Sequence, residues 1–185
     1  MSTVIGVCGY PGAGKSTFCR EMASRFGLPV IATGEVVRRR IAERGWTPTP
    51  ASVAQMSDEI RAATGQRFLR VVQPEMVAAL GRAPAVLLDC VREEADLLTL
   101  REVANRVALV AIAAAGPVRA ARSLGRARPG DPTSAEDLAA REQMERRLGV
   151  ADLLARAEHT LVNDHGLADF LDRAAATVRG ILGAA

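Results

Sequence analysis

The chain has 185 residues, 49% of them hydrophobic, and a formal net charge of +3, which fits one domain with its own core. This charge is too small for a dedicated nucleic-acid or membrane-surface binder, so neither partner is expected. The N-terminus lacks the charged-then-apolar layout of a signal peptide, and the 3 cysteines have no CxxC spacing. We therefore expect a cytoplasmic protein with reduced thiols, whose oligomeric state these features leave open.

Short apolar runs alternate with helical patterns along the chain. The first half contains a strand at Val4–Cys8, a helix at Lys15–Arg25, a strand at Leu28–Ala32, a helix at Gly34–Arg44, a helix through Met56 and Ile60 that stops at Gly65, and a helix at Gln66–Leu80 broken by Pro74. The second half contains a strand at Ala85–Asp89, a helix at Glu93–Asn105, a strand at Val107–Ala114, a helix from Thr133, a strand at Thr160–Asn163 and a helix at Leu167–Leu182. This alternation predicts an α/β domain over residues 1–185, with five parallel strands covered by helices on both faces.

A phosphate-binding pattern, Gly9-x-x-x-x-Gly14-Lys15-Ser16, lies between the first strand and the first helix. In this context glycines let backbone N–H groups point at phosphate oxygens, the lysine reaches the β and γ phosphates, and the hydroxyl can ligate Mg²⁺. The residues expected to bind the triphosphate are Gly9, Tyr10, Pro11, Gly12, Ala13, Gly14, Lys15, Ser16 and Thr17. The expected cofactors are ATP and Mg²⁺.

Lys15 is the one lysine among 24 basic residues. Arginine has replaced lysine at every other basic position, so Lys15 marks a place where a compact ammonium is required. A tight phosphate cradle is such a place.

Other classes of P-loop protein fit the sequence less well. A guanine-reading Asn/Thr-Lys-x-Asp motif would need a second lysine, and the strand ending at Asp89 continues with Cys90 rather than with the Glu of large oligomeric ATPases. A small kinase with an acceptor-binding segment and an arginine-rich lid remains.

Three further segments resemble nucleotide kinases. Ala32–Arg38 reads Ala-Thr-Gly-Glu-Val-Val-Arg and resembles the adenylate-kinase segment Ser-Thr-Gly-Asp-x-Leu-Arg. Leu87–Arg92 reads Leu-Leu-Asp-Cys-Val-Arg and is similar to that family's Leu-Asp-Gly-Phe-Pro-Arg, with one residue fewer before the arginine. Ala157–Asp164 resembles the Ala-Asp-x-x-Ile-x-Asn-Asp-Gly stretch of dephospho-coenzyme A kinases.

The order of these pieces over nearly all of the chain resembles a largely archaeal family of P-loop nucleotide kinases. Its members share Gly-x-Pro-Gly-x-Gly-Lys-Ser, Gly-Asp-Val-Val-Arg, Asp-Gly-x-Arg and Arg-x-Asp-Asp-Pro, where this chain has Gly-Glu-Val-Val-Arg, Asp-Cys-Val-Arg and Arg-Pro-Gly-Asp-Pro for the last three. The resemblance implies phosphoryl transfer from ATP to a small-molecule acceptor. It also implies an acceptor segment over about residues 34–81 and a lid segment over about residues 116–148.

Asp89 and the arginines receive their roles partly from chemistry and partly from this resemblance. Asp89, at the end of a buried strand, is expected to hold Mg²⁺ together with Ser16, or else to cap the next helix. The resemblance places Thr33, Gly34, Arg38 and Arg92 around the acceptor phosphate, whereas a solvated helix face is the alternative for the arginines.

Four lid arginines lie within ten residues without an acid: Arg119, Arg122, Arg126 and Arg128. The first three share one helical face by spacing. We expect Arg122, Arg126 and Arg128 to stabilise the transferring phosphoryl group and Arg119 to contact the nucleotide, with a solvated helix or an RNA-binding patch as alternatives. Arg141 is a weaker lid candidate, and the resemblance places Asn163 beside the adenine.

Glu35 separates the possible acceptors. A nucleoside monophosphate offers an ionised phosphate and needs no base, whereas a hydroxyl acceptor such as dephospho-coenzyme A needs a carboxylate to orient or take its proton. Glu35 is in the place for that role, or it only favours the start of its helix. A P-loop ATPase switch that regulates a macromolecular partner remains the alternative function.

Overall fold

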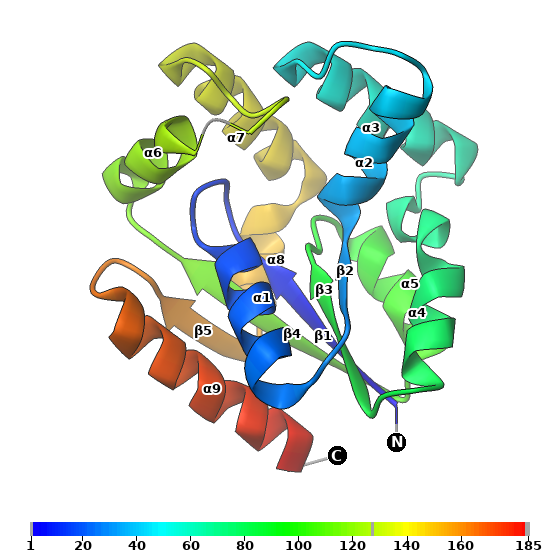
Figure 1. Cartoon of the computed structure of the whole chain (residues 1–185), viewed down its shortest axis with the longest axis vertical. Coiled ribbons are helices and arrows are strands. Elements are labelled where there is room, and N and C mark those ends of the chain that lie inside the picture. The colour runs from blue at the N-terminus through cyan, green and yellow to red at the C-terminus, as the bar shows by residue number, and fades with distance from the viewer. Residues whose placement is uncertain (1, 127, 184–185) are drawn as a thin grey trace.

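A parallel sheet of five strands in the order β2-β3-β1-β4-β5 forms the centre of the computed structural model, which describes residues 2–126 and 128–183 (Figure 1). The strands are β1 (Thr3–Cys8), β2 (Val30–Ala32), β3 (Ala85–Asp89), β4 (Arg106–Ala113) and β5 (His159–Val162). All four neighbouring pairs are parallel. The predicted five-stranded parallel sheet is therefore confirmed.

Helices connect the strands and cover both faces of the sheet (Figure 1). Those that the structure describes are α1 (Lys15–Phe26), α2 (Thr33–Glu43), α3 (Pro50–Ala63), the short 3₁₀ helix η1 (Phe68–Val71), α4 (Gln73–Leu80), α5 (Glu94–Val103), α6 (Gly116–Gly125), α7 (Ala135–Leu148), α8 (Val150–Arg156) and α9 (Leu167–Gly183).

The side chains of β1 alternate between two apolar cores. Ile5 and Val7 pack with α1 and α9 on one face, whereas Val4 and Cys8 pack with α2, α5 and α8 on the other. Every residue of β1 is buried. Central strands covered on both faces by helices are expected to be apolar throughout, as this one is.

One predicted helix and one predicted strand differ in the structure. The single helix expected over Gln66–Leu80 is a 3₁₀ turn followed by α4, with Pro74 in the first turn of α4. Proline lacks the N–H that a helix interior needs, so it marks the start of a new helix here. The second strand is also shorter than predicted, because the Leu28 N–H bonds back to Ala23 at the end of α1.

The helix expected from Thr133 begins two residues later. The Ser134 hydroxyl accepts a hydrogen bond from the Asp137 N–H, and the Thr133 hydroxyl and N–H donate to the Asp137 carboxylate. Ser134 is therefore the N-cap residue of α7. Gly149, at φ 97°, then separates α7 from α8.

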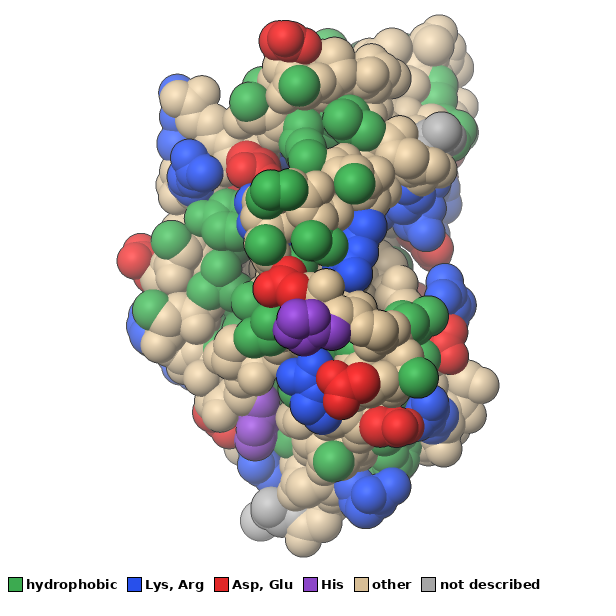
Figure 2. All heavy atoms as spheres, turned by 90° about the vertical axis from the view of Figure 1, so that its left-hand side faces the viewer, with side chains coloured by type: hydrophobic (Ala, Val, Ile, Leu, Met, Phe, Trp, Pro, Cys, Tyr) green, Lys and Arg blue, Asp and Glu red, His purple; other side chains and the backbone are tan. Residues whose placement is uncertain are grey.

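The carboxyl ends of β1 and β3 open toward a space between two pairs of helices. Figure 1 shows α2 and α3 above one side of the sheet and α6 and α7 above the other. Ligands gather at this edge of parallel sheets. Over the residues described, no helix has the length and apolar content to cross a membrane. On the face that carries α6, β5 and α9, acidic and basic side chains are interspersed (Figure 2).

Candidate active site

The phosphate-binding loop joins β1 to the N-terminus of α1. Gly14 precedes α1 with φ 108°, and a Cβ there would collide with the amide nitrogen of Asn163. Gly12 has φ 76°, and a Cβ there would collide with the carbonyl oxygen of Arg119. These two glycines are therefore required by backbone conformation and by the close approach of α6 and of the β5–α9 loop.

The Lys15 ammonium lies folded over this loop. It donates hydrogen bonds to the carbonyl oxygens of Gly9 (2.6 Å) and Tyr10 (3.0 Å). A triphosphate on the loop would offer the ammonium charged oxygens in their place. The site fits a phosphate, because it combines the N-terminus of α1, the N–H groups of the loop and the Lys15 ammonium.

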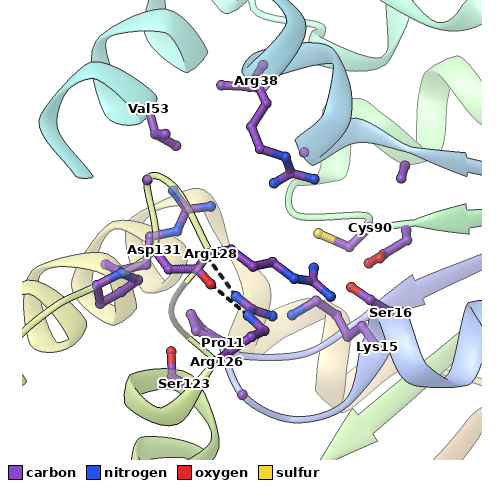
Figure 3. A pocket seen from close by; sticks show the side chains of 18 of the residues that line it. Pro11, Lys15, Ser16, Arg38, Val53, Cys90, Ser123, Arg126, Arg128 and Asp131 are labelled. Carbon is purple, nitrogen blue, oxygen red and sulfur yellow. Dashed lines mark hydrogen bonds and ion pairs between the residues drawn. The ribbon is translucent and has the colours of Figure 1, made fainter. Parts of the chain in front are cut away.

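A cavity of about 970 Å³ extends from the loop to the acceptor segment and the lid segment. In Figure 3, Arg38 extends from α2 toward the space that Lys15 and Ser16 face from the other side. Other predicted site residues that line it are Pro11, Gly12, Gly14, Thr17, Gly34, Glu35, Asp89, Arg92, Arg122, Arg126 and Arg128. Residues from distant parts of the chain thus meet in one cavity.

Thr33 supports the Asp89–Cys90 segment, which lines this cavity. Its side chain is fully buried at the junction of β2 and α2, and its hydroxyl donates to the carbonyl oxygen of Asp89 (3.2 Å) and accepts from the N–H of Cys90 (3.3 Å). The hydroxyl is thus engaged by backbone. Any contribution of Thr33 to an acceptor therefore acts through the position of the Asp89–Cys90 segment.

Ser16 and Asp89 provide the oxygen ligands expected of a magnesium site. Both line the cavity, one with a hydroxyl and one with a carboxylate. Mg²⁺ prefers oxygen ligands, keeps several waters, and is held by one or two carboxylates plus substrate phosphates. Within the described residues, no cluster of three His, Cys, Asp or Glu forms a protein-only metal site. The two residues fit an ion carried in with a nucleotide.

Glu145 holds two arginines in the cavity wall and was not found by sequence reasoning. Its carboxylate lies 3.2 Å from the Nε of Arg92 and 3.1 Å from an Nη of Arg141. Burial raises the pKa of Glu145, but the charges of Arg92, Arg141 and Lys15 outweigh burial and leave its pKa below the usual value. The i,i+4 spacing to Arg141 is visible in the sequence, whereas the contact with Arg92 joins distant segments.

The four lid arginines have four different environments. Arg119 lies over the Tyr10 ring, 5.1 Å from its centre, and pairs with Glu142 (2.7 Å). Arg122 donates to the carbonyl oxygen of Asn163 (2.8 Å).

Arg126 and Arg128 belong to the loop after α6, which ends at Gly125. Arg126 forms two hydrogen bonds with Asp131 (2.7 and 2.9 Å; Figure 3). Arg128 is exposed and lines the cavity. Arg126 is the C-cap of α6 and keeps helical backbone angles (φ −78°, ψ −31°), and the side chains of Arg119, Arg122 and Arg126 contact separate partners.

Asn163 is buried against the phosphate-binding loop. Its side-chain N–H donates to the carbonyl oxygen of Ala13 (2.8 Å). Asn163, Arg119 and Thr33 are absent from the cavity wall as far as the described residues define it. The adenine contact predicted for Asn163 stays a prediction.

The tip of the lid loop touches the acceptor segment. Gly130, at φ 81°, packs against the side chain of Val53 on α3, and a Cβ on Gly130 would lie 2.6 Å from a Val53 methyl group. Lid and acceptor segments therefore meet above the cavity.

Burial disfavours the thiolate form of the cysteines near the site. Burial raises the pKa of Cys8 to about 12 and also raises the pKa of Cys90. A nucleophilic cysteine needs a depressed pKa. Cys90 therefore packs beside Asp89 as a small apolar side chain.

Comparison with known proteins identifies the family. A family model described as an AAA domain matches residues 8–139. The UPF0200 protein of Pyrobaculum aerophilum is 34% identical over 164 residues, which cover 89% of each chain. The chain belongs to the UPF0200 family. The resemblance to a largely archaeal P-loop family is confirmed.

Two solved kinases share the fold of this UPF0200 protein. A gluconokinase from Sinorhizobium meliloti has a TM-score of 0.60 at 22% identity, covering 98% of this chain and 93% of that chain. A shikimate kinase from Acinetobacter baumannii, in complex with shikimate, has a TM-score of 0.58 at 18% identity with the same coverage. These likenesses show the fold that this chain shares with the two kinases.

Proposed function

We propose that this protein transfers the γ-phosphoryl group of ATP, with Mg²⁺, to a small nucleotide-like acceptor of the nucleoside monophosphate or dephospho-coenzyme A type. One observation carries the proposal. The same cavity of about 970 Å³ is lined by Lys15 and Ser16 on the donor side, Glu35 and Arg38 on the acceptor side, and Arg128 from the lid. Phosphoryl transfer depends mainly on positioning and charge stabilisation, which such an arrangement supplies.

The phosphate-binding loop provides the donor half of the reaction. Its backbone N–H groups and Lys15 bind the β and γ phosphates, and the ammonium gives up its two loop carbonyls to do so. Ser16 and Asp89 would hold Mg²⁺, which would neutralise charge on the phosphates.

The lid segment provides cations and excludes water. Arg122, Arg126 and Arg128 reach the cavity from α6 and the loop after it. Guanidinium groups stabilise charge spread over the transferring phosphoryl oxygens. The contact of Gly130 with Val53 keeps this loop above the cavity.

The acceptor side combines one arginine with one carboxylate. Arg38 lines the cavity, and no described residue forms an ion pair with it within 4 Å, so its guanidinium is available for an acceptor phosphate. Glu35 is exposed on the first turn of α2 at the cavity rim. A hydroxyl acceptor would use Glu35 to orient its proton.

The test is incubation of the protein with labelled ATP, Mg²⁺ and a pool of nucleoside monophosphates, nucleosides and dephospho-coenzyme A. A new phosphorylated product that disappears in Lys15→Ala supports the proposal. We expect Arg38→Ala to raise the KM of that acceptor about tenfold or more, because a charged hydrogen bond is lost. Arg39→Ala is the matched control, since Arg39 is exposed on the same helix and pairs with Glu43.

Two further outcomes separate the alternatives. A large loss of turnover in Glu35→Gln assigns a hydroxyl acceptor, whereas an unaffected Glu35→Gln assigns a phosphate acceptor. Release of free phosphate with no acceptor product contradicts the kinase proposal and favours an ATPase switch with a macromolecular partner.

A further inference from the structure

Glu145 is a buried carboxylate in the wall of the cavity. It lies on α7, within the lid segment, and only 3% of its surface is exposed. Arg92 comes from the loop after β3, and Arg141 lies one turn earlier on α7. Glu145 therefore joins the lid segment to the sheet edge where Asp89 ends β3.

This arrangement is poorly explained by stability alone. A buried ion pair loses hydration energy, and apolar residues of similar volume often give equal or higher stability. One oxygen of Glu145 also remains buried without a hydrogen-bond donor among the described residues. A costly group of this kind beside a phosphate site points to a role in function.

The contact geometry indicates what that role is. Glu145 meets Arg92 at Nε, the inner edge of the guanidinium, and Arg92 itself lines the cavity. The 3.2 Å contact at Nε is an ion pair without hydrogen-bond geometry, so Glu145 attracts the inner edge of Arg92 by charge and leaves its terminal Nη groups available for a phosphate. Because an arginine side chain otherwise has many rotamers, a carboxylate that attracts its inner edge lowers the entropy lost on binding.

We propose that Glu145 is a positioning residue that holds Arg92 and Arg141 toward the phosphoryl group in the cavity. This inference rests on the proposed function, since it assumes that the cavity holds that group. Glu145 does not touch the phosphate itself, which its negative charge would repel. It acts through the two arginines. Because Glu145 lies on α7, the position of the arginines depends on where α7 packs over the site.

The experiment measures phosphoryl transfer from Mg·ATP to acceptor or, as basal hydrolysis, to water, together with the Kd of Mg·ATP. We expect Glu145→Gln to lower kcat about tenfold or more, while the Kd changes far less. Glu145→Asp keeps the charge but shortens the side chain, and we expect an intermediate kcat. Glu102→Gln is the matched control, because Glu102 forms its ion pair with Arg67, away from the cavity.

A double-mutant cycle with Arg92→Ala decides whether Glu145 acts through that arginine. We expect Glu145→Gln to have little further effect once Arg92 is alanine. Additive losses, an unchanged kcat, or a loss confined to the Kd would each overturn the proposal. Thermal unfolding shows whether Glu145→Gln is misfolded. If it is, Glu145→Asp replaces it in the double-mutant cycle with Arg92→Ala.

The two proposals fail in different ways. Basal hydrolysis reports on Glu145 even if every acceptor in the pool is refused, which is how the kinase proposal would fail. A phosphorylated acceptor combined with an additive cycle would instead retain the kinase and reject the role of Glu145.

Discussion

The side chain of Asn163 donates a hydrogen bond to the carbonyl oxygen of Ala13, 2.8 Å away, within the phosphate-binding loop. These residues are 150 positions apart in the chain. Asn163 also accepts a hydrogen bond from Arg122 at its own carbonyl oxygen. The end of β5 is thus connected both to the loop that would hold the triphosphate and to a lid arginine that would act on it.

We expect Asn163→Asp to weaken triphosphate binding. The substitution removes the N–H donor and places an acceptor against the Ala13 carbonyl, so the Kd of ATP should rise about tenfold. Calorimetric titration with ATP and with tripolyphosphate gives the measurement. Equal weakening of both ligands means that Asn163 acts by ordering the loop.

A different result would assign Asn163 to the adenine. In that case ATP binding weakens while tripolyphosphate binding is unchanged. Asp164→Asn is the control, because its side-chain oxygen can still accept the Ala115 N–H.

The pH dependence of stability should report on Asp96, at the start of α5. Burial raises the pKa of this carboxyl from 3.8 to about 7, although hydrogen bonds from the N–H groups of Arg92 and Glu93 act in the opposite direction. The folded protein then holds a proton that the unfolded chain releases. The free energy of unfolding therefore falls as pH rises from 3.8 to about 7, by at most about 1.4 kcal/mol per pH unit.

Asp96→Asn mimics the protonated carboxyl and should remove this dependence. Urea unfolding of both proteins between about pH 5 and pH 8 measures the difference. We expect the variant to gain stability over the natural protein as pH rises, with the difference levelling off above about pH 7. Parallel curves over the whole range would contradict a raised pKa for Asp96.

Local patterns in the sequence predicted the sheet and the phosphate-binding loop. The apolar run of β1, the glycine spacing and Lys15 each depend on neighbours within a few residues. The same holds for the end of α7, where Gly149 adopts φ 97° and could have been predicted as a helix terminator.

Contacts between distant segments were not predictable in this way. The hydroxyl of Thr33 binds the backbone of the Asp89–Cys90 segment, and Glu145 on α7 reaches Arg92 in the loop after β3. Either contact depends on how the strands and the lid segment are arranged in space. A motif can nominate Thr33 for the site, but the direction of its hydroxyl follows from the order of β2 and β3 in the sheet.

The contact between Gly130 and Val53 should hold the lid loop over the cavity. Gly130→Ala adds a Cβ that would lie 2.6 Å from a Val53 methyl group and places alanine at φ 81°. We expect a loss of about 1 kcal/mol in stability from the backbone conformation and a fall in kcat from the displaced loop. Gly125→Ala is the control, since a Cβ there meets nothing within 4 Å.

A second substitution separates the two effects of Gly130→Ala. Val53→Ala removes the colliding methyl groups, so the double variant should recover kcat while the stability cost of the positive φ persists. Stopped assays with Mg·ATP give kcat, and thermal unfolding gives stability. If the double variant does not recover kcat, the lid loop does not reach its working position through Val53.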